Sequence, residues 1–121
     1  MPFELRIASP RDAVLALVER DPDAVIIASH GGELIGSVIA GWDGWRYHLY
    51  RLAVRPDWRR RGVATALLDA AQARFEALGA TRVDAMVLAR NDLGHRLWRA
   101  AGFREQEDWR RWVKEVSPPT R

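Results

Sequence analysis

The stretch most able to do chemistry runs from Leu52 to Leu68. It places the end of a β-rich segment, a basic loop with a glycine and the start of a helical pattern in direct succession. A helix N-terminus presents unpaired backbone N–H groups and the positive end of a dipole, which together favour anions and phosphate groups. Gly62 lets the backbone approach such a ligand closely. The stretch lacks the Gly-Lys-Ser/Thr of a Walker A loop and the further glycines of a dinucleotide-binding fingerprint.

The positive charge of the chain is concentrated in this loop. Residues 51–61 hold five arginines and one aspartate, a local charge of +4, whereas the whole chain of 121 residues carries +3. Basic charge in one place indicates a local anionic partner. A solvated run of arginines beside an ordinary turn glycine is the alternative interpretation.

Other reactive side chains are sparse. The chain has no cysteine, and its three histidines lack metal-ligand spacing, so neither a disulfide framework nor a metal site is expected. His48, Tyr50 and Leu52 follow one another at period two, which predicts that they share one face of a strand. An imidazole changes charge near neutral pH, so His48 is a candidate general base. A packed histidine is the alternative, and Asp84 is a second candidate base.

Periodicity and turn residues predict the elements before the loop. The sequence favours a strand over 3–8, and a helix that begins at Ser9-Pro10 and ends before Asp21. It then predicts a hairpin of strands 24–29 and 33–40 around Gly31-Gly32, followed by a third antiparallel strand over 45–54.

The same signals predict the elements after the loop. Helical spacing indicates a helix over 63–78, stopped by Gly79, and a strand over 82–88 follows it. A further helix, capped by Asn91 or Asp92, carries an apolar stripe of Leu93, Leu97, Trp98 and Ala101. A last hairpin is expected over 103–105 and 109–116.

This order of elements predicts an α/β (α+β) domain in which helices flank a mostly antiparallel mixed sheet in three layers. The chain is 48% hydrophobic and 29% charged, which is ordinary for a globular protein. We expect one domain over residues 1–116, with 117–121 as a frayed tail. The apolar runs are too short to cross a membrane, and charge at once after Met1 argues against a secretory signal, so a cytoplasmic location is expected.

Three motifs in order resemble those of the GNAT acyltransferases. Arg59-x-x-Gly62-x-Ala64 resembles the family's acetyl-CoA signature, and Leu52-Ala53-Val54 with Pro56 resembles the strand before it. Asn91, Leu97-Trp98 and Gly102-Phe103 resemble a later segment of the family. The resemblance implies the GNAT fold and an N-acetyltransferase that moves an acetyl group from acetyl-CoA to a primary amine by direct attack, with no metal.

The resemblance also assigns a cofactor site. The pantetheine arm of CoA would pair with the strand that ends at Val54, and backbone N–H groups of residues 60–65 would hold the pyrophosphate. The acetyl carbonyl would lie near the N–H of Ala53 or Val54. Asn91 would contact the cofactor chain, cap its helix, or do both. The implied cofactor-binding residues are Leu52, Ala53, Val54, Arg59, Arg60, Arg61, Gly62, Val63, Ala64, Thr65 and Asn91.

Two departures from the family bear on catalysis. Trp98 stands where relatives often carry a tyrosine that is a candidate general acid, and an indole N–H is not a usable acid, so core packing is favoured for Trp98. Met86 stands where some relatives carry a glutamate base. The catalytic candidates are therefore His48 and Tyr50, with Trp98 at the tyrosine position, and a water relay without a dedicated base is an alternative.

The expected partners are acetyl-CoA and an amine, either a small molecule or an amine on a protein or peptide, with no membrane partner. A homodimer stays open. A CoA-binding accessory or sensor protein that has lost catalysis is one rival, suggested by Trp98 and Met86. A nucleic-acid-binding module is the other, suggested by an isoelectric point of about 10.1 and six tryptophans. One basic loop without a recognised binding motif disfavours nucleic acid.

Overall fold

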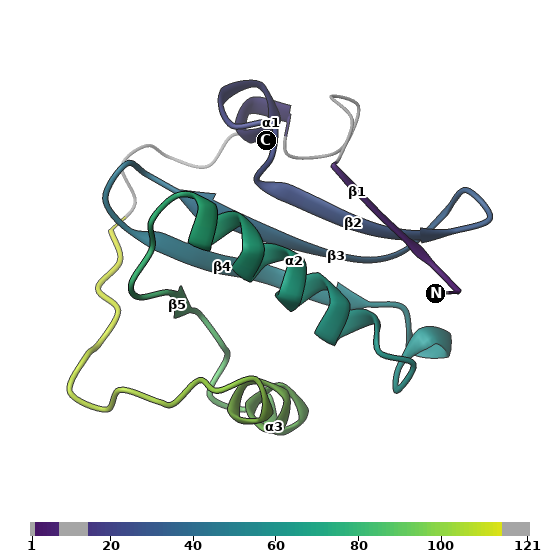
Figure 1. Ribbon diagram of the computed structural model, residues 1–121. Coiled ribbons are helices and arrows are strands. Elements are labelled where there is room, and N and C mark those ends of the chain that lie inside the picture. Colours follow the sequence, from purple (N-terminus) through teal and green to yellow (C-terminus); the bar gives the residue numbers. More distant parts are fainter. Residues whose placement is uncertain (1, 8–14, 115–121) are drawn as a thin grey trace.

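A computed structural model describes residues 2–7 and 15–114. In these residues five strands form one sheet in the order β1-β2-β3-β4-β5, so each strand lies beside its neighbour in sequence (Figure 1). The first four pair antiparallel, and β5 pairs parallel to β4. The strands are β1 (Glu4–Ile7), β2 (Val25–His30), β3 (Glu33–Trp42), β4 (Tyr47–Val54) and β5 (Asp84–Ala85).

Helices cover both faces of this sheet. α2 (Val63–Ala77) runs along one face, across β3 and β4 (Figure 1), and α3 (Asp92–Ala100) lies beside it. α1 (Leu15–Arg20) covers the opposite face, where its Val18 packs with Val25 and Ile27. A short 3-10 turn, η1 (Pro56–Trp58), joins β4 to the loop before α2. The structure therefore confirms the predicted α/β fold with helices on both sides of a mixed sheet.

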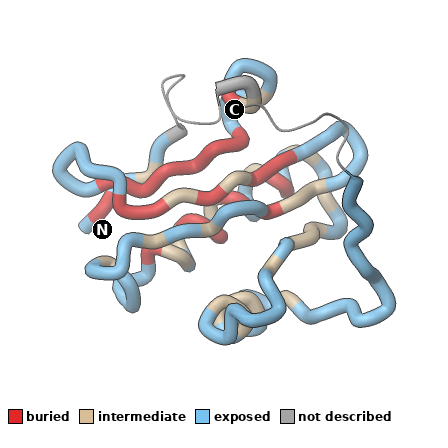
Figure 2. Tube along the Cα trace, turned by 180° about the vertical axis from the view of Figure 1, so that it is seen from behind, coloured by how far each residue is buried: buried red, intermediate tan, exposed pale blue. Residues whose placement is uncertain are grey.

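The main core lies between α2 and the sheet. Leu67, Ala71 and Phe75 repeat every fourth residue and form the buried stripe of α2. They pack against Ile35 and Val38 of β3, which are both fully buried. Figure 2 shows the buried residues concentrated on the central strands. β2 is buried on both faces, which explains its continuous apolar sequence.

The predicted hairpin and the following meander are confirmed. Gly31 and Gly32 form the turn between β2 and β3, and β3 pairs with β4 from Gly36 to Trp42. Gly36 of β3 lies under the start of α2, where an added Cβ would stand 2.9 Å from Val63 Cγ1 and 3.1 Å from the Ala53 carbonyl oxygen. Glycine at this position lets α2 begin directly above the end of β4.

β4 contains a bulge that corrects one expectation. Tyr50 pairs with Ile39 and Ala53 pairs with Ser37, so β4 has one more residue than β3 between these points. Arg51 is the extra residue, and its backbone lies in the left-handed region with a φ of 51°. The bulge reverses the alternation of side chains, so Leu52 packs in the core on the α2 side with Leu49. The expectation that Leu52 shares a face with His48 and Tyr50 is therefore wrong.

β5 is shorter than the strand expected over 82–88. Only Asp84 and Ala85 pair with β4, because β4 bulges two residues later and no longer follows the line of β5. Met86 and Leu88, just beyond, are exposed. The stripe expected on α3 is also wrong in part, because Leu93 and Ala101 are exposed while Leu97 and Trp98 are half-buried.

The hairpin expected over 103–105 and 109–116 is not formed in the described residues, which end at 114. Trp109, Trp112 and Val113 are exposed, and their spacing does not alternate, so they give a strand no single apolar face. Phe103 instead packs edge-on against Trp98, with ring centroids 5.0 Å apart. The expected helix start at Ser9-Pro10 and the tail 117–121 lie outside the described residues. Within the described ranges, no helix is long and apolar enough to cross a membrane.

Candidate active site

The loop between β4 and α2 presents an open helix N-terminus. Gly62 is the N-cap of α2 with a φ of 81°, and no side chain caps the helix there. The first helical hydrogen bond runs from the Ala66 N–H to the Gly62 carbonyl at 3.0 Å, so the N–H groups of the preceding turn are left for another acceptor. Apart from Gly62 and its two chain neighbours, no atom of the described residues lies within 4 Å of the place where a Cβ of Gly62 would stand. This turn can therefore accept an anion through its backbone.

The arginines of the loop have different surroundings. Arg55 is bonded to Glu33 and Asp57, and the guanidinium of Arg61 lies over the ring of Trp58 at 4.7 Å from its centroid. Arg59 and Arg60 are exposed, and Arg60 has a left-handed backbone with a φ of 62°. Arg61 is also exposed, so all three predicted phosphate-binding arginines are open to a ligand, with Arg61 stacked on Trp58.

β4 and β5 separate beside this loop. They pair at His48–Asp84 and Leu49–Ala85, and then β4 continues from Tyr50 to Val54 with no strand on its β5 side among the described residues. Backbone polar groups at such an edge can pair with an extended ligand. The predicted residues Leu52, Ala53 and Val54 lie on this free length of β4.

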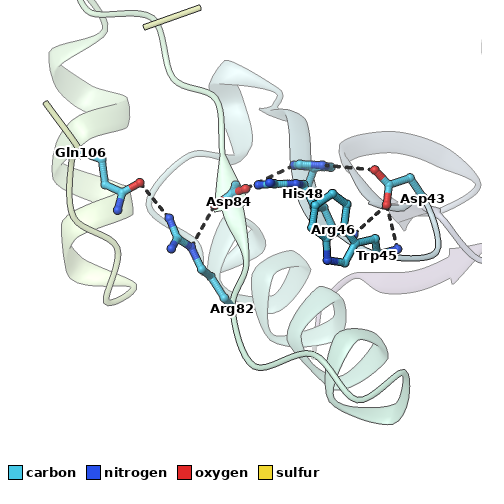
Figure 3. Close-up of polar contacts among 7 residues, drawn as sticks. All are labelled: Asp43, Trp45, Arg46, His48, Arg82, Asp84 and Gln106. Atoms are coloured by element: carbon cyan, nitrogen blue, oxygen red, sulfur yellow. Dashed lines mark hydrogen bonds and ion pairs between the residues drawn. The ribbon is translucent and has the colours of Figure 1, made fainter. Parts of the chain in front are cut away.

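A second group of polar side chains lies where the two strands still touch. The ring of His48 stands between two carboxylates (Figure 3). Its Nδ1 is 3.7 Å from Asp84 Oδ2, and its Nε2 is 4.0 Å from Asp43 Oδ2. Tyr50 is the neighbour of His48 along the strand, with ring centroids 5.6 Å apart. His48 and Tyr50 pair with Gly41 and Ile39, and Ile39 packs on the α1 side of the sheet. Both side chains therefore face away from α2.

Local structure shifts the pKa of two members of this group. Asp43 lies in the β3–β4 turn, where its Oδ1 accepts hydrogen bonds from the backbone N–H of Arg46 and of Trp45. These bonds, that of Arg46 first, lower the pKa of Asp43 below its ordinary value. Burial, with the charges of Asp43 and Asp84, raises the pKa of Tyr50 above 10.0, so its phenol stays protonated at neutral pH.

The two remaining predicted residues lie on α3. Asn91 is the N-cap of α3, because its Oδ1 accepts a hydrogen bond from the Gly94 N–H at 2.9 Å. Trp98 packs against the main core and makes an edge contact with Phe103. Between α2 and α3 lies a hollow of about 360 Å³, lined by residues that include Thr65, Leu68, Leu97 and Phe103. Thr65 belongs to the first turn of α2, so the hollow begins beside the open helix N-terminus.

Comparison with known proteins assigns the family. The model of the acetyltransferase (GNAT) family matches residues 2–103. The chain belongs to the GNAT acetyltransferase family. This confirms the resemblance drawn from the motifs around Gly62 and Asn91.

Curated relatives and solved structures agree with this assignment. A protein named acetyltransferase from Sodalis glossinidius is 39% identical over 75 residues, which are 62% of this chain and 53% of that protein. A Pectobacterium atrosepticum acetyltransferase is 40% identical over the same shares. The matched segment of the GNAT chain thus spans about half the length of these relatives.

Among solved structures, Ard1 from Thermoplasma volcanium has a TM-score of 0.77 at 21% identity, covering 85% of this chain and 83% of that one. Aminoglycoside N-acetyltransferase AAC(6')-Iy, solved with CoA, has a TM-score of 0.76 at 24% identity, covering 94% and 95%. At these identities the likeness shows that the fold is shared.

The sequence did not reveal two residues of the site. Asp43 was missed, although the Asp43-Gly44 pair is a turn signal that places a carboxylate beside the start of β4. Arg55 was counted only as loop charge, since its bonds to Glu33 join segments far apart in sequence.

Proposed function

We propose that this GNAT protein is an N-acetyltransferase that moves an acetyl group from acetyl-CoA to a primary amine. One observation carries the proposal. The strands β4 and β5 part beside the open N-terminus of α2, so a phosphate-binding turn and a free strand edge lie next to each other. That pair of features suits a ligand with both a pyrophosphate and an extended amide chain.

The residues of the loop fit the CoA moiety. The space around Gly62 is open and the first turn of α2 lacks a side-chain cap, which suits a bulky pyrophosphate. Arg59 and Arg60 add positive charge, and Val63, Ala64 and Thr65 supply the backbone of that first turn. The amide-bearing arm would pair with the edge from Leu52 to Val54, and Asn91 and Arg61 would border it.

The acceptor amine would approach from the other face of the sheet. His48 and Tyr50 face away from α2, so they lie across the sheet from the turn that would hold the phosphates. His48 lies between the carboxylates of Asp43 and Asp84, which would stabilise its imidazolium after it takes a proton. This arrangement favours His48 as the group that removes a proton from the incoming ammonium.

The proposed reaction is a direct transfer. His48 would take a proton from the ammonium, so that the amine nitrogen has a free lone pair. The amine then forms a C–N bond with the acetyl carbonyl carbon, the nitrogen gives up its second proton, the C–S bond breaks, and the thiolate takes a proton. Tyr50 carries a phenol that is protonated at neutral pH and is a candidate donor for that last step. Holding the two reactants together supplies much of the rate.

A CoA-binding protein without catalysis is the second candidate. It is favoured by the packing of Trp98, which stands at the family's tyrosine position but lies against Phe103 and the core. In this case CoA would bind as proposed, but no amine would be acetylated.

A turnover screen separates the two candidates. Free thiol is measured on incubating the protein with acetyl-CoA and a panel of polyamines, amino acids, aminoglycosides and peptides, and each product is confirmed by mass. Acetylated product from at least one amine is expected. Acetyl-CoA at 100 times its dissociation constant should also stabilise the fold by about 2.7 kcal/mol in a melt. A melting shift without product would favour the silent binder, and no shift at millimolar acetyl-CoA would overturn both.

A further inference from the structure

Arg55 stands at the start of the basic loop, yet its guanidinium is engaged within the protein. Its Nη1 donates to Glu33 Oε2 at 3.1 Å. Its Nε and Nη2 donate to the two carboxylate oxygens of Asp57 at 3.2 and 2.9 Å. This is a bidentate contact, in which the planar guanidinium matches the geometry of the carboxylate. These bonds, to Glu33 first and then to Asp57, raise the pKa of Arg55.

The backbone of Arg55 is bonded on both sides. Its N–H donates to the Ile35 carbonyl of β3 at 2.8 Å, and its carbonyl accepts from the Trp58 N–H at 2.9 Å. Arg55 therefore connects the start of β3 to the turn η1 through both its backbone and its side chain.

A second contact joins η1 to the β2–β3 hairpin. The ring of Trp58 lies 4.9 Å from the ring of His30, which ends β2 at the β2–β3 turn. The guanidinium of Arg61 covers Trp58. The β2–β3 hairpin thus holds η1 at an ionic contact and at an aromatic contact.

The loop beyond η1 has a backbone that needs such support. Arg60 and Gly62 have φ values of 62° and 81°, and a left-handed arginine persists only where its surroundings hold it. Both residues lie at the turn that would receive the phosphates. Anything that loosens η1 would therefore disorder the N–H groups that the ligand needs.

We propose that Arg55 is a positioning residue for the CoA phosphates, which ties η1 to the β2–β3 hairpin and thereby fixes the backbone of residues 59–62. Arg55 does this through Glu33 and Asp57 and does not touch the ligand. The inference rests on the proposed function, because it requires that this loop binds CoA. It adds a role for Arg55, Glu33 and Asp57, none of which the family motifs assign.

The signs of the charges make this proposal testable. Glu33→Gln and Asp57→Asn each remove a negative charge near a site for an anion, so charge alone would make CoA bind more tightly. Loss of the positioning contact would make CoA bind more weakly. The side chains of Glu33 and Asp57 are largely exposed and that of Arg55 is partly exposed, so the variants are expected to fold.

Binding of CoA is measured by calorimetry, with no amine present, for the wild type and for Arg55→Gln, Arg55→Lys, Glu33→Gln and Asp57→Asn. We expect the dissociation constant to rise about threefold for the Glu33 and Asp57 variants and about tenfold for Arg55→Gln, as lost charge-assisted bonds would give. Arg55→Lys, which keeps the charge without the fork, should lie between. Arg104→Gln and Asp108→Asn, exposed positions beyond α3, serve as charge-matched controls and should not change affinity.

Two results carry the decision. Weaker binding of both carboxylate variants supports the positioning role, and unchanged or tighter binding overturns it while leaving the proposed function in place. If Arg55→Gln fails to fold, these two variants still decide. Absence of CoA binding by the wild type overturns the proposed function itself, and the inference with it.

Discussion

His48 of β4 and Asp84 of β5 are partners in the sheet register, and their side chains meet with Nδ1 3.7 Å from Oδ2. The pair is one of the two at which these strands run together, just before they part, and the carboxylate of Asp43 lies on the other side of the ring. A histidine between two carboxylates, at the opening where the amine would meet the acetyl group, is well placed to take a proton.

Replacing His48 by glutamine should slow acetyl transfer to the best amine of the screen by about 100-fold at neutral pH, the lower range for a general base. The matched control is His95→Gln on α3, where the ring contacts the Leu88 carbonyl. Full activity of His48→Gln, with unchanged melting, would instead point to a water relay.

Gly62→Glu should weaken CoA binding by at least about tenfold, because it brings negative charge to the phosphate turn. Any side chain at a φ of 81° also strains the fold, by about 1 kcal/mol. Gly79→Glu is the control, since Gly79 ends α2 at a φ of 88° in equally open space. Calorimetry and melts on both proteins separate the two effects. Equal CoA affinity in the two variants would place the phosphates elsewhere.

Trp98→Phe should lower stability by about 1 kcal/mol and leave turnover per folded molecule nearly unchanged, because a smaller aromatic keeps most of the contact with Phe103. Trp98→Tyr should raise turnover about tenfold if proton delivery to the thiolate limits the rate. Turnover, melting temperature and CoA affinity are measured on the three proteins. Loss of activity in Trp98→Phe, with melting and affinity intact, would mean that the indole acts in catalysis.

Tyr50 should ionise at higher pH than a free phenol. Its pKa is raised above 10.0 chiefly by burial, and the carboxylates of Asp43 and Asp84 add to the shift. The unfolded chain therefore loses this proton first, so the stability due to Tyr50 is full below pH 10 and declines as the pH rises through the folded pKa. Ultraviolet titration of the wild type minus that of Tyr50→Phe isolates the transition. A midpoint at or below 10 would show that the phenol is freely solvated.

The parts of the fold that could be predicted are those determined by residues close together in the sequence. The Gly31-Gly32 pair predicted the β2–β3 hairpin. The spacing of four residues between Leu67, Ala71 and Phe75 predicted α2 nearly to its ends. No glycine in β4 marks the position of the bulge. A strict period of two therefore placed Leu52 on the wrong face of the sheet. The tryptophans at 109 and 112 look strand-like by composition, but no strand pairs with them in the described residues.

The candidate site divides in the same way. The phosphate turn is one continuous segment, so its motif could be identified from sequence alone. The setting of His48 depends on the register between β4 and β5, and that of Arg55 on a contact with Glu33, 22 residues earlier. Such contacts are made by tertiary packing, which a linear pattern does not encode.

The bulge at Arg51 shifts the alternation of side chains along β4 by one position. Before it the odd positions, Tyr47 and Leu49, point toward α2, and after it the even positions, Leu52 and Val54, do so. Deleting Arg51 would place Leu52 opposite Val38 and give a regular strand, with Leu52 and Val54 still toward α2. Pairing all eight residues of β4 without the bulge would instead turn Leu52 and Val54 outward and Ala53 inward. A designer who moves this edge to another scaffold can therefore drop the Arg51 position, but cannot give it a partner of its own in the next strand.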